Sequence, residues 1–530
     1  MSYSDKPART LFCALSLAVM TANAAFAADA PPATQPAVAE SRVLVKKVAF
    51  TGNKTFTSDQ LSAQLAADLG RPLTFKDINA LARKIEAYYH LSGYRLAKVV
   101  VPQQDFAHQD ALQLVVLEGW LGKIEVNGNK RYSDQRVIDA LKAGGVETAK
   151  PFTLEDVERA LTRLNRQSGI EVSSTLQPGK ELGSTDLVVN LEEAPRVQGA
   201  LEANNYGNDN TGEYRVIPSL QFADLTGRGD ELNLLAMQSL GEGDLHFEYL
   251  DYTTPLNARG THAHAYYSQG NVDIGSQFRV LEIEGDNTSW GLGLSQDFVR
   301  SARTIYTAGA WLEYQDLDQS MLGQSTAEDK IRKLRFSFGL DNTDLYGRTL
   351  ASLDLHQGLG EALGGMDDSS SMSSRAYAHA DNDFTKLSFD LTRLQQINAR
   401  LLVIPRIYGQ FSADSLVSSE QWAIGGFGSV AGHPASAYSG DHGVTASVEG
   451  RYSLFSDSDR YQLTSRLEHG RIWIKDPLPE QNDSEDLTGF SVGLLARPLK
   501  SVDLRLDWGL PVGEKTEDSS YVYAQARYHF

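Results

Sequence analysis

Apolar and polar side chains alternate strictly along many segments of the second part of the chain. In residues 334–340, every second residue is leucine or phenylalanine, with arginine, serine and glycine between them. Residues 502–508 repeat the pattern with aspartate and arginine at the alternate positions. Successive side chains of a strand point to opposite faces, so each segment predicts a strand with one apolar and one polar face.

The last ten residues follow the same pattern and end in an aromatic residue. Their apolar face consists of Val522, Ala524, Ala526, Tyr528 and Phe530, and polar residues and tyrosines stand between them. An edge strand of a soluble sheet has the same pattern, so the alternation alone leaves two interpretations open. An outer-membrane β-barrel also closes on such a strand. Tyr528 and Phe530 are then expected to form the signal that the barrel assembly machinery recognises.

The first 27 residues are typical of an export signal, which favours the barrel interpretation. Lys6 and Arg9 precede an apolar run at residues 11–20, and Ala25-Phe26-Ala27 fits a small-residue cleavage site. A membrane anchor is the alternative, but the run is short for a bilayer span. Cleavage after residue 27 removes Cys13, the single cysteine, and leaves no thiol for a disulfide or a metal site.

Charge and hydropathy narrow the choice further. The chain has 68 acidic and 49 basic residues and a formal net charge of −19 at pH 7, which argues against a nucleic-acid partner. Beyond the signal, no stretch approaches 18 uninterrupted apolar residues. A membrane protein without such helices must be a closed barrel, because lipid leaves open backbone groups unsatisfied. A charge facing lipid costs roughly 2–4 kcal/mol, so the polar faces are predicted to line the lumen.

The barrel is predicted to occupy residues 196–530. Roughly 20 residues for each strand and its share of loop give about 16 antiparallel strands, an even number as expected for such barrels. The Ala- and Pro-rich residues 28–42 are expected to be a flexible leader.

The residues between leader and barrel contain one unit used twice. Residues 48–54 and 124–130 both end in Gly-Asn-Lys. Three pairs of landmarks recur at a constant offset of 76 residues: Gly52 and Gly128, Gly93 and Gly169, and Pro102 and Pro178. A constant offset over three landmarks indicates two copies of one module.

Each copy, residues 43–119 and 120–195, is predicted to fold in the order β-α-α-β-β. In the first copy, Thr57 and Thr74 begin two helices with the spacing of a capping box. Gly93 is predicted to end the second helix. The fold class is therefore two α+β modules followed by an all-β transmembrane barrel.

Several short motifs carry a resemblance to a known family. Gly93-Tyr94 followed by residues 101–104, together with residues 204–215 and 224–230, resembles in order the motifs of two-partner secretion transporters, the ShlB/FhaC/HecB family. The repeated unit resembles the POTRA module of that family. The resemblance implies two periplasmic POTRA modules and a barrel in the outer membrane of a Gram-negative bacterium.

The first module is expected to capture the exported protein by adding an extended segment to a sheet edge. The predicted groove lies between the second helix and a strand at residues 96–101. Its candidate contact residues are Ile78, Ile85, Tyr88, Leu96, Lys98, Val99, Val100 and Val101. The Val99→Pro substitution is expected to abolish secretion but not barrel insertion, because proline cannot donate to a β-ladder.

One family motif departs from its usual form. The family keeps an arginine in a Val-Arg-Gly motif on a loop that folds into the lumen, paired with an aspartate of a Phe-x-Asp-x-Gly motif on the wall. Here the loop motif is Val430, Ala431, Gly432 and His433, and the wall motif contains Glu468 and Gly470. The usual ion pair cannot form with Ala431. A pair of His433 with Glu468 is one substitute, and other contacts to the loop are the alternative.

These features favour an outer-membrane pore that exports a large adhesin or haemolysin-like partner protein. A factor that inserts other outer-membrane proteins and a passive solute porin are the alternatives. An enzyme is not expected, because Phe427 breaks a Gly-x-Ser-x-Gly pattern around Ser429 and the 11 histidines lack metal-ligand spacing. No cofactor or metal is expected. The expected partners are the exported protein, the barrel assembly machinery and outer-membrane lipid.

Overall fold

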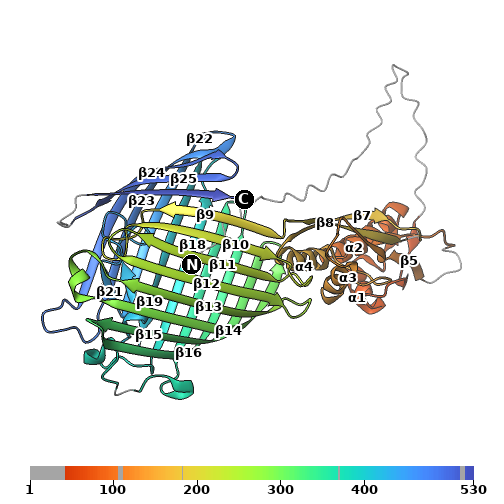
Figure 1. Ribbon diagram of the computed structural model, residues 1–530. Coiled ribbons are helices and arrows are strands. Elements are labelled where there is room, and N and C mark those ends of the chain that lie inside the picture. The colour runs from red at the N-terminus through yellow and green to blue at the C-terminus, as the bar shows by residue number, and fades with distance from the viewer. Residues whose placement is uncertain (1–41, 106–110, 182, 368–369, 514–519) are drawn as a thin grey trace.

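The computed structural model describes residues 42–105, 111–181, 183–367, 370–513 and 520–530. The expected export signal lies outside the described residues, as does the leader apart from Arg42. Figure 1 shows an α/β region at one end of a large barrel. No helix of the described part is long and apolar enough to cross a membrane.

The first module is a three-stranded sheet packed against two helices. Its elements are β1 (Val43–Leu44), β2 (Lys47–Thr51), α1 (Ser58–Leu65), η1 (Ala66–Asp68), β3 (Pro72–Leu73), α2 (Phe75–Leu91), β4 (Lys98–Val100) and β5 (Ala111–Leu117). Strand β5 is central, parallel to β2 and antiparallel to β4, so β2 and β4 are the two edges. The small pair β1–β3 was not expected from the sequence and adds a short strand between the helices.

Both helices of this module begin where the sequence predicts. Thr57 and Thr74 each accept a hydrogen bond from the backbone N–H three residues later, and the side chains at those positions bond back in complete capping boxes. Gly93 follows α2 with φ +95°, a conformation that other residues disfavour. Strand β4 is shorter than the predicted residues 96–101 because the N–H of Ala97 bonds back to the preceding turn.

The second module repeats this topology without the extra pair. Its elements are β6 (Trp120–Asn127), α3 (Asp134–Ala143), α4 (Leu154–Asn165), β7 (Ile170–Pro178) and β8 (Ser184–Glu193). Strand β8 is central, parallel to β6 and antiparallel to β7. Because β6 and β8 correspond to β2 and β5, the two copies share the order β-α-α-β-β.

Sixteen antiparallel strands close into the barrel, the number that the sequence predicts. They are β9 (Val197–Asn204), β10 (Tyr214–Ala223), β11 (Glu231–Leu240), β12 (Asp244–Pro255), β13 (Thr261–Asp273), β14 (Glu284–Ser301), β15 (Thr304–Met321), β16 (Gln324–Thr343), β17 (Gly347–Gly358), β18 (Thr385–Gln396), β19 (Leu401–Ser412), β22 (His442–Phe455), β23 (Ser458–Trp473), β24 (Ser484–Leu499), β25 (Val502–Pro511) and β26 (Tyr521–His529). The loops between strands contain η2 (Ser276–Leu281), η3 (Ala362–Gly364), η4 (Ala376–Ala378), η5 (Ser418–Glu420), β20 (Trp422–Ile424) and β21 (Tyr438–Gly440).

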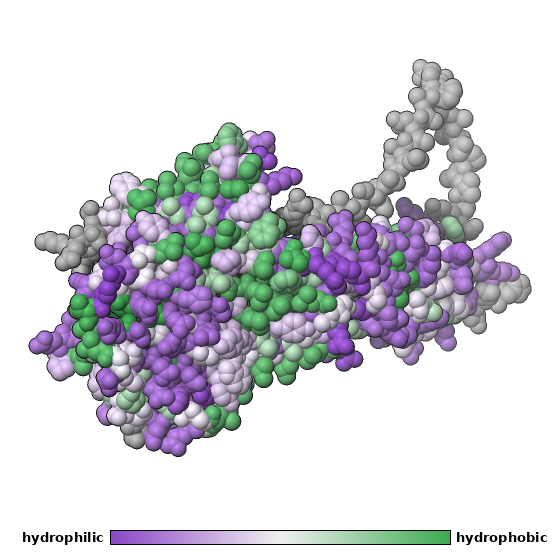
Figure 2. All heavy atoms as spheres, in the orientation of Figure 1, coloured by the Kyte–Doolittle hydropathy of each residue, from purple (hydrophilic) through white to green (hydrophobic). Residues whose placement is uncertain are grey.

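The alternating pattern sorts side chains between the lumen and the outside as expected. Phe336 and Phe338 are 49% and 48% exposed on the outer wall. Arg335, directly before Phe336, points inward and contacts Glu313 at 2.8 Å. Figure 2 shows hydrophobic residues gathered on the part of the wall nearest the α/β region. The apolar face is therefore available to lipid, and the charges pair within the lumen.

The barrel closes where its last strand meets its first. Strand β26 pairs with β9, and Gly199 and Phe530 exchange two backbone hydrogen bonds of 3.0 Å. A side chain at position 199 would meet the Phe530 ring, so glycine leaves room for that ring. Tyr528 and Phe530 are both largely exposed on the outer face. The seam thus holds the residues predicted to form the assembly signal, although their recognition stays a prediction.

The second module is attached directly to one rim of the barrel. The guanidinium group of Arg166 makes two hydrogen bonds to Asp297 of β14, at 2.5 and 3.0 Å. Arg136 donates to the carbonyl oxygens of Gly227 and Arg228 in the turn between β10 and β11. Ala258, in the turn between β12 and β13, packs against the hydrophobic core of the module. These contacts attach the second module to one mouth of the lumen (Figure 1).

Candidate pore loop and client-binding edge

The loop between β19 and β22, residues 413–441, folds into the barrel. Its strands β20 and β21 pair with each other. Ile424 and Val430 are fully buried against Ile472 of β23 and Leu487 of β24. The predicted motif residues Ala431 and His433 are also buried, at 0% and 1% exposure. We call residues 413–441 the pore loop.

The backbone of the motif segment is held by hydrogen bonds to two strands of the wall, β23 and β26. The N–H of Ala431 donates to a carboxylate oxygen of Glu468 at 2.8 Å. The N–H of Gly432 donates to the hydroxyl of Tyr523 at 3.1 Å. A backbone N–H therefore contacts Glu468 where the family resemblance implies an arginine side chain at position 431.

The suggested pair between His433 and Glu468 is wrong. Nε2 of His433 lies 2.9 Å from the carbonyl oxygen of Thr488 on β24. Because a carbonyl accepts only, this nitrogen carries the proton and donates. The imidazole is therefore directed to the neighbouring strand rather than to Glu468.

Glycines of the wall form the seat into which the motif segment fits. A Cβ at Gly470 would lie 3.0 Å from side-chain atoms of both Ile424 and Val430. A Cβ at Gly489 would strike the carbonyl oxygen of Ala431. Gly470 was a predicted motif residue, and its role is now explained by close approach of the loop.

Two arginines of the wall, Arg466 and Arg505, contact Phe427 of the pore loop. Arg466 donates to the carbonyl oxygen of Phe427 at 3.0 Å. The guanidinium carbons of Arg466 and Arg505 lie 4.6 and 4.8 Å from the centre of the Phe427 ring, within the range of cation–π attraction. The ring also stacks on Tyr206 at 4.3 Å. Here the cations are on the wall, whereas the family pattern has its cation on the loop.

The predicted client groove of the first module is only partly accessible. Ile78 and Ile85 are 2% and 0% exposed and belong to the hydrophobic core, so their assignment to the groove is wrong. The helical stripe that contains them faces the sheet of their own module. Tyr88 packs against Phe56 at 4.9 Å, and Leu96 packs against the core of the second module.

The edge strand β4 presents a different surface from the one expected. Lys98 and Val100 are exposed, whereas Val99 and Val101 pack against the core. The N–H of Val99 donates to Glu86 of α2 at 3.3 Å, and the same carboxylate contacts Lys98 at 2.8 Å. Partial burial opposes the charge, but Lys98 and the Val99 N–H outweigh it and lower the pKa of Glu86. Glu86 thus covers an edge donor that an incoming strand would need.

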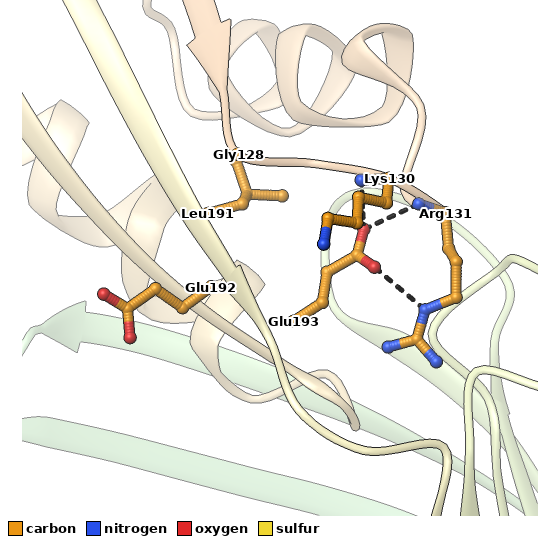
Figure 3. A pocket seen from close by; sticks show the side chains of 6 residues that line it. All are labelled: Gly128, Lys130, Arg131, Leu191, Glu192 and Glu193. Carbon is orange, nitrogen blue, oxygen red and sulfur yellow. Dashed lines mark hydrogen bonds and ion pairs between the residues drawn. The ribbon is translucent and has the colours of Figure 1, made fainter.

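A carboxylate of the second module closes the turn after its first strand. Figure 3 shows Glu193 directed at the backbone of residues 130–131, while Glu192 is turned away. Glu193 accepts from the N–H groups of Lys130, Arg131 and Tyr132 at 2.7, 2.7 and 3.1 Å. Glu118 does the same for residues 54 and 55 of the first module. An open pocket of about 340 Å³ adjoins this turn. Its backbone N–H donors are already bonded to Glu193, so they are not free to bind an anion.

Glu193→Gln is expected to destabilise the second module in a pH-dependent way. Burial opposes ionisation, but three backbone donors and Arg131 hold the pKa of Glu193 at about 2. Because the pKa is lower in the folded protein than in the unfolded chain, the ionised carboxylate stabilises the fold at a pH above about 4.5. This stabilisation is lost as the pH falls from about 4.5 to 2. The difference corresponds to about 3 kcal/mol. Urea unfolding followed at 222 nm reports the modules, because the described α-helices all lie in them.

Glu192→Gln is the matched control for this measurement. Glu192 is the exposed neighbour in the same strand. It should leave the free energy of unfolding within about 0.5 kcal/mol of the parent. An equal pH profile for the Glu193→Gln protein and its parent would show that the carboxylate does not stabilise the turn.

Comparison with known proteins places the chain in a family. Residues 183–496 match the family described as haemolysin secretion/activation protein ShlB/FhaC/HecB. Residues 43–119 match the ShlB-type POTRA domain. The first match covers more than half of the chain. The chain belongs to the ShlB/FhaC/HecB family.

Individual relatives agree with this assignment. The chain is 26% identical over 486 residues to the hemolysin transporter protein ShlB of Serratia marcescens, covering 88% of this chain and 83% of that protein. It is 24% identical over 412 residues to the heme/hemopexin transporter protein HuxB of Haemophilus influenzae (strain 86-028NP), covering 77% and 72%. The solved structure of CdiB from Escherichia coli has the same fold, with a TM-score of 0.77 at 20% identity over 94% of this chain and 93% of that chain.

The family assignment confirms the main predictions from the sequence. This ShlB/FhaC/HecB protein is an outer-membrane transporter of the two-partner secretion type, with a 16-stranded barrel and its α/β modules on the periplasmic side. The modules contact the turns after β10 and β12, which identifies that rim as periplasmic. The pore loop and the loop at residues 359–384 therefore start from the extracellular rim.

Sequence reasoning missed several residues that hold this site together. Glu86 carries no motif, although it stands on the helix beside the predicted edge. Phe427 was used only to reject a hydrolase pattern. Glu118 and Glu193 lie 75 residues apart, one residue short of the 76-residue offset of the repeat, and each stands at or directly after the end of the last strand of its module, so they could have been sought as an equivalent pair. Among the residues that the structure describes, no group of three or more His, Cys, Asp or Glu side chains is placed to hold a metal ion.

Proposed function

We propose that this transporter exports one large partner protein, adhesin or haemolysin-like, from the periplasm to the cell surface. The observation that carries the proposal is the position of the two modules, whose sheets have edge strands, at the periplasmic mouth of the barrel. The lumen of this barrel holds a folded loop. The names of the relatives support the partner class, since ShlB is a hemolysin transporter and HuxB a heme/hemopexin transporter. A passive porin would leave the modules without a role.

The edge strand β4 is proposed to receive an extended segment of the partner. An added strand needs free backbone donors and acceptors along the edge. Val99 supplies one donor, which Glu86 covers in the resting protein. Binding then consists of an exchange in which a carbonyl oxygen of the partner replaces the Glu86 carboxylate. Lys98, released from Glu86, would favour an acidic residue in the incoming segment.

The attachment of the second module directs the captured segment toward the lumen. Asp297 is 4% exposed and takes both hydrogen bonds from Arg166 as well as one from Thr307 at 2.8 Å. Such a bidentate pair fixes orientation as well as distance. The segment would therefore leave the modules beside the pore mouth. No nucleotide is available in the periplasm, so folding of the partner outside is proposed to drive export.

The proposal is tested by the exported proteins of a strain that lacks this chain. Surface and medium fractions are compared with the parent strain by mass spectrometry. We expect the loss of one very large exported protein with other outer-membrane proteins unchanged. A general loss of outer-membrane proteins would instead identify an assembly factor, and an unchanged set of exported proteins would overturn the proposal.

Two substitutions on the edge are expected to act in opposite directions. Glu86→Ala frees the Val99 N–H, and a net hydrogen-bond contribution of about 0.5–1.5 kcal/mol predicts up to about tenfold tighter capture. Val99→Pro removes the donor and should abolish capture, while barrel insertion stays normal because β26 is unchanged. Capture is measured in cells as cross-linking yield from a photoreactive residue at exposed position 100.

Lys84→Ala is the control for these variants. Lys84 lies on the same helix and pairs with Asp68 on the surface, away from β4. It should cross-link like the parent. If Val99→Pro also cross-links and secretes like the parent, the partner binds elsewhere, and the second module becomes the next candidate.

A further inference from the structure

The pore loop enters the lumen through a short turn that ends in a buried acid. Glu420, the last residue of η5, is 3% exposed. Its carboxylate contacts Nζ of Lys333 on β16 and lies 2.6 Å from Nζ of Lys386 on β18. A buried carboxylate is thus placed between two buried ammonium groups from opposite sides of β17.

The backbone of the same residue is also held by the wall. The carbonyl oxygen of Glu420 accepts from Nζ of Lys386 at 3.0 Å and from the amide of Gln410 at 2.9 Å. Three strands of the wall, β16, β18 and β19, therefore converge on one residue of the loop. The position of Glu420 is fixed through both its side chain and its main chain.

The positive charges of Lys333 and Lys386 are balanced only while Glu420 lies between them. Lys333 also lies 3.9 Å from Glu313, which pairs more closely with Arg335 at 2.8 Å. The contacts of Lys386 besides Glu420 are to Gln410. If Glu420 left, Lys386 would keep no carboxylate of its own, and two buried cations would remain in the wall. Removal of one member of a buried charge group is unfavourable for this reason.

This contact is separate from the seat of the motif segment. The seat involves residues 427–433 and strands β23 to β26, whereas Glu420 contacts β16 to β19 on another part of the wall. Along the loop, strand β20 lies between the two attachments, and its partner β21 follows the seated segment. The loop is therefore attached to the wall at two separate places.

We infer that Glu420 is a positioning residue of the pore: its ion pairs with Lys333 and Lys386 hold the loop across the lumen in the resting state. Release of this contact frees one side of the loop, and the conduit widens around the segment that is still seated. The inference rests on the proposed role of the barrel lumen as the export conduit. The residues that would control opening of the lumen are then Glu420, Lys333 and Lys386, and none of them belongs to a sequence motif of the family.

Ion conductance of the purified full-length transporter in planar lipid bilayers tests the inference without the exported partner. Glu420→Lys places three cations together and is expected to raise the time spent in large-conductance states at least tenfold. Glu420→Gln is the milder variant and is expected to raise it severalfold. The exchange of all three charges, Glu420→Lys with Lys333→Glu and Lys386→Glu, is expected to restore the parent behaviour.

Asp390→Asn is the matched control, because Asp390 pairs with Arg406 between neighbouring wall strands and does not contact the loop. A thiol at position 417 gives a second measurement: Val417, three residues before Glu420, is fully buried, so the Val417→Cys side chain is shielded while Glu420 is held at the wall. It should react with a membrane-impermeant maleimide faster in the Glu420→Lys background than in the parent. Heat-dependent gel mobility first establishes that each variant is a folded barrel.

Three results would overturn the inference. They are parent-like conductance and thiol reactivity in both single variants, failure of the triple exchange to restore closure, or an equal effect of Asp390→Asn. Failure of the proposed function is distinguishable, because it would leave these client-free measurements intact while the strain lacking the chain still exported its proteins.

Discussion

The Gly432→Val protein is expected to hold its pore loop outside the seat and to conduct ions far more readily than the parent. Gly432 has φ +88°, and an added Cβ would meet the backbone of Leu510 and lie 2.6 Å from the nitrogen of Pro511. A side chain in the left-handed region costs about 1–2 kcal/mol. Overpacking adds about 1–3 kcal/mol. A sum of about 2–5 kcal/mol corresponds to at least about 30-fold in the seating equilibrium.

Gly428→Val provides the comparison within the same loop. Gly428 is exposed, and no atom lies within 4 Å of the position that its Cβ would take. It should leave conductance and the hydrogen exchange of residues 424–433 unchanged. If Gly432→Val also keeps parent conductance and slow exchange at these amides, the seat is not what closes the lumen, and the ion pairs of Glu420 would have to close it alone.

The architecture was predictable because it depends on local patterns. Alternation with period two fixes which face of a strand meets lipid, and the number of residues then limits the number of strands. The capping residues Thr57 and Thr74 were identified correctly because a cap involves side chains and N–H groups only three residues apart. The repeat was visible because both copies use the same turn chemistry at Gly52 and Gly128.

The groove in the first module was predicted incorrectly in part because one pattern has two meanings. The stripe that contains Ile78 and Ile85 predicts a helix, and the same stripe is the face that the helix buries. Residues on the flank of such a stripe are the accessible ones. Glu86 is on that flank, but its bond to the N–H of Val99 depends on how the helix crosses the strand, which the sequence does not give.

The fastening of the pore loop could not be predicted because its contacts are distant in sequence. Lys333 and Glu420 are 87 residues apart, and Gly432 and Tyr523 are 91 residues apart. Such pairs follow from the order of strands around the barrel and from the path of one long loop. The wall motif around Glu468 was located through its resemblance to the family. The family pattern has its positive charge on the loop, and it therefore did not indicate that Arg466 and Arg505 of the wall contact the loop here.

Arg375→Ala is expected to loosen the loop between β17 and β18, here called the extracellular cap, which packs against Leu416 and Val417 of the pore loop. Arg375 lies in the loop between β17 and β18, and its side chain is 4% exposed. It donates to Asp441 at 2.5 Å, to the carbonyl oxygen of Leu416 at 2.6 Å and to that of Lys475 at 3.0 Å. One side chain thus joins three extracellular loops. Its loss leaves the carboxylate of Asp441 buried without a cation, a change that costs about 3–5 kcal/mol.

The measurement is the rate at which a protease cleaves this loop in intact cells. We expect cleavage at residues 370–384 to become at least tenfold faster in the Arg375→Ala strain. Arg393→Ala is the control, since Arg393 pairs with Asp344 on an exposed turn and such pairs contribute about 0–1 kcal/mol. Unchanged protection would mean that the apolar cluster of Met366, Phe384 and Leu416 holds the cap without the ion pair. Faster cleavage with parent conductance would separate the cap from the gate, because Glu420 would still hold the pore loop in the lumen.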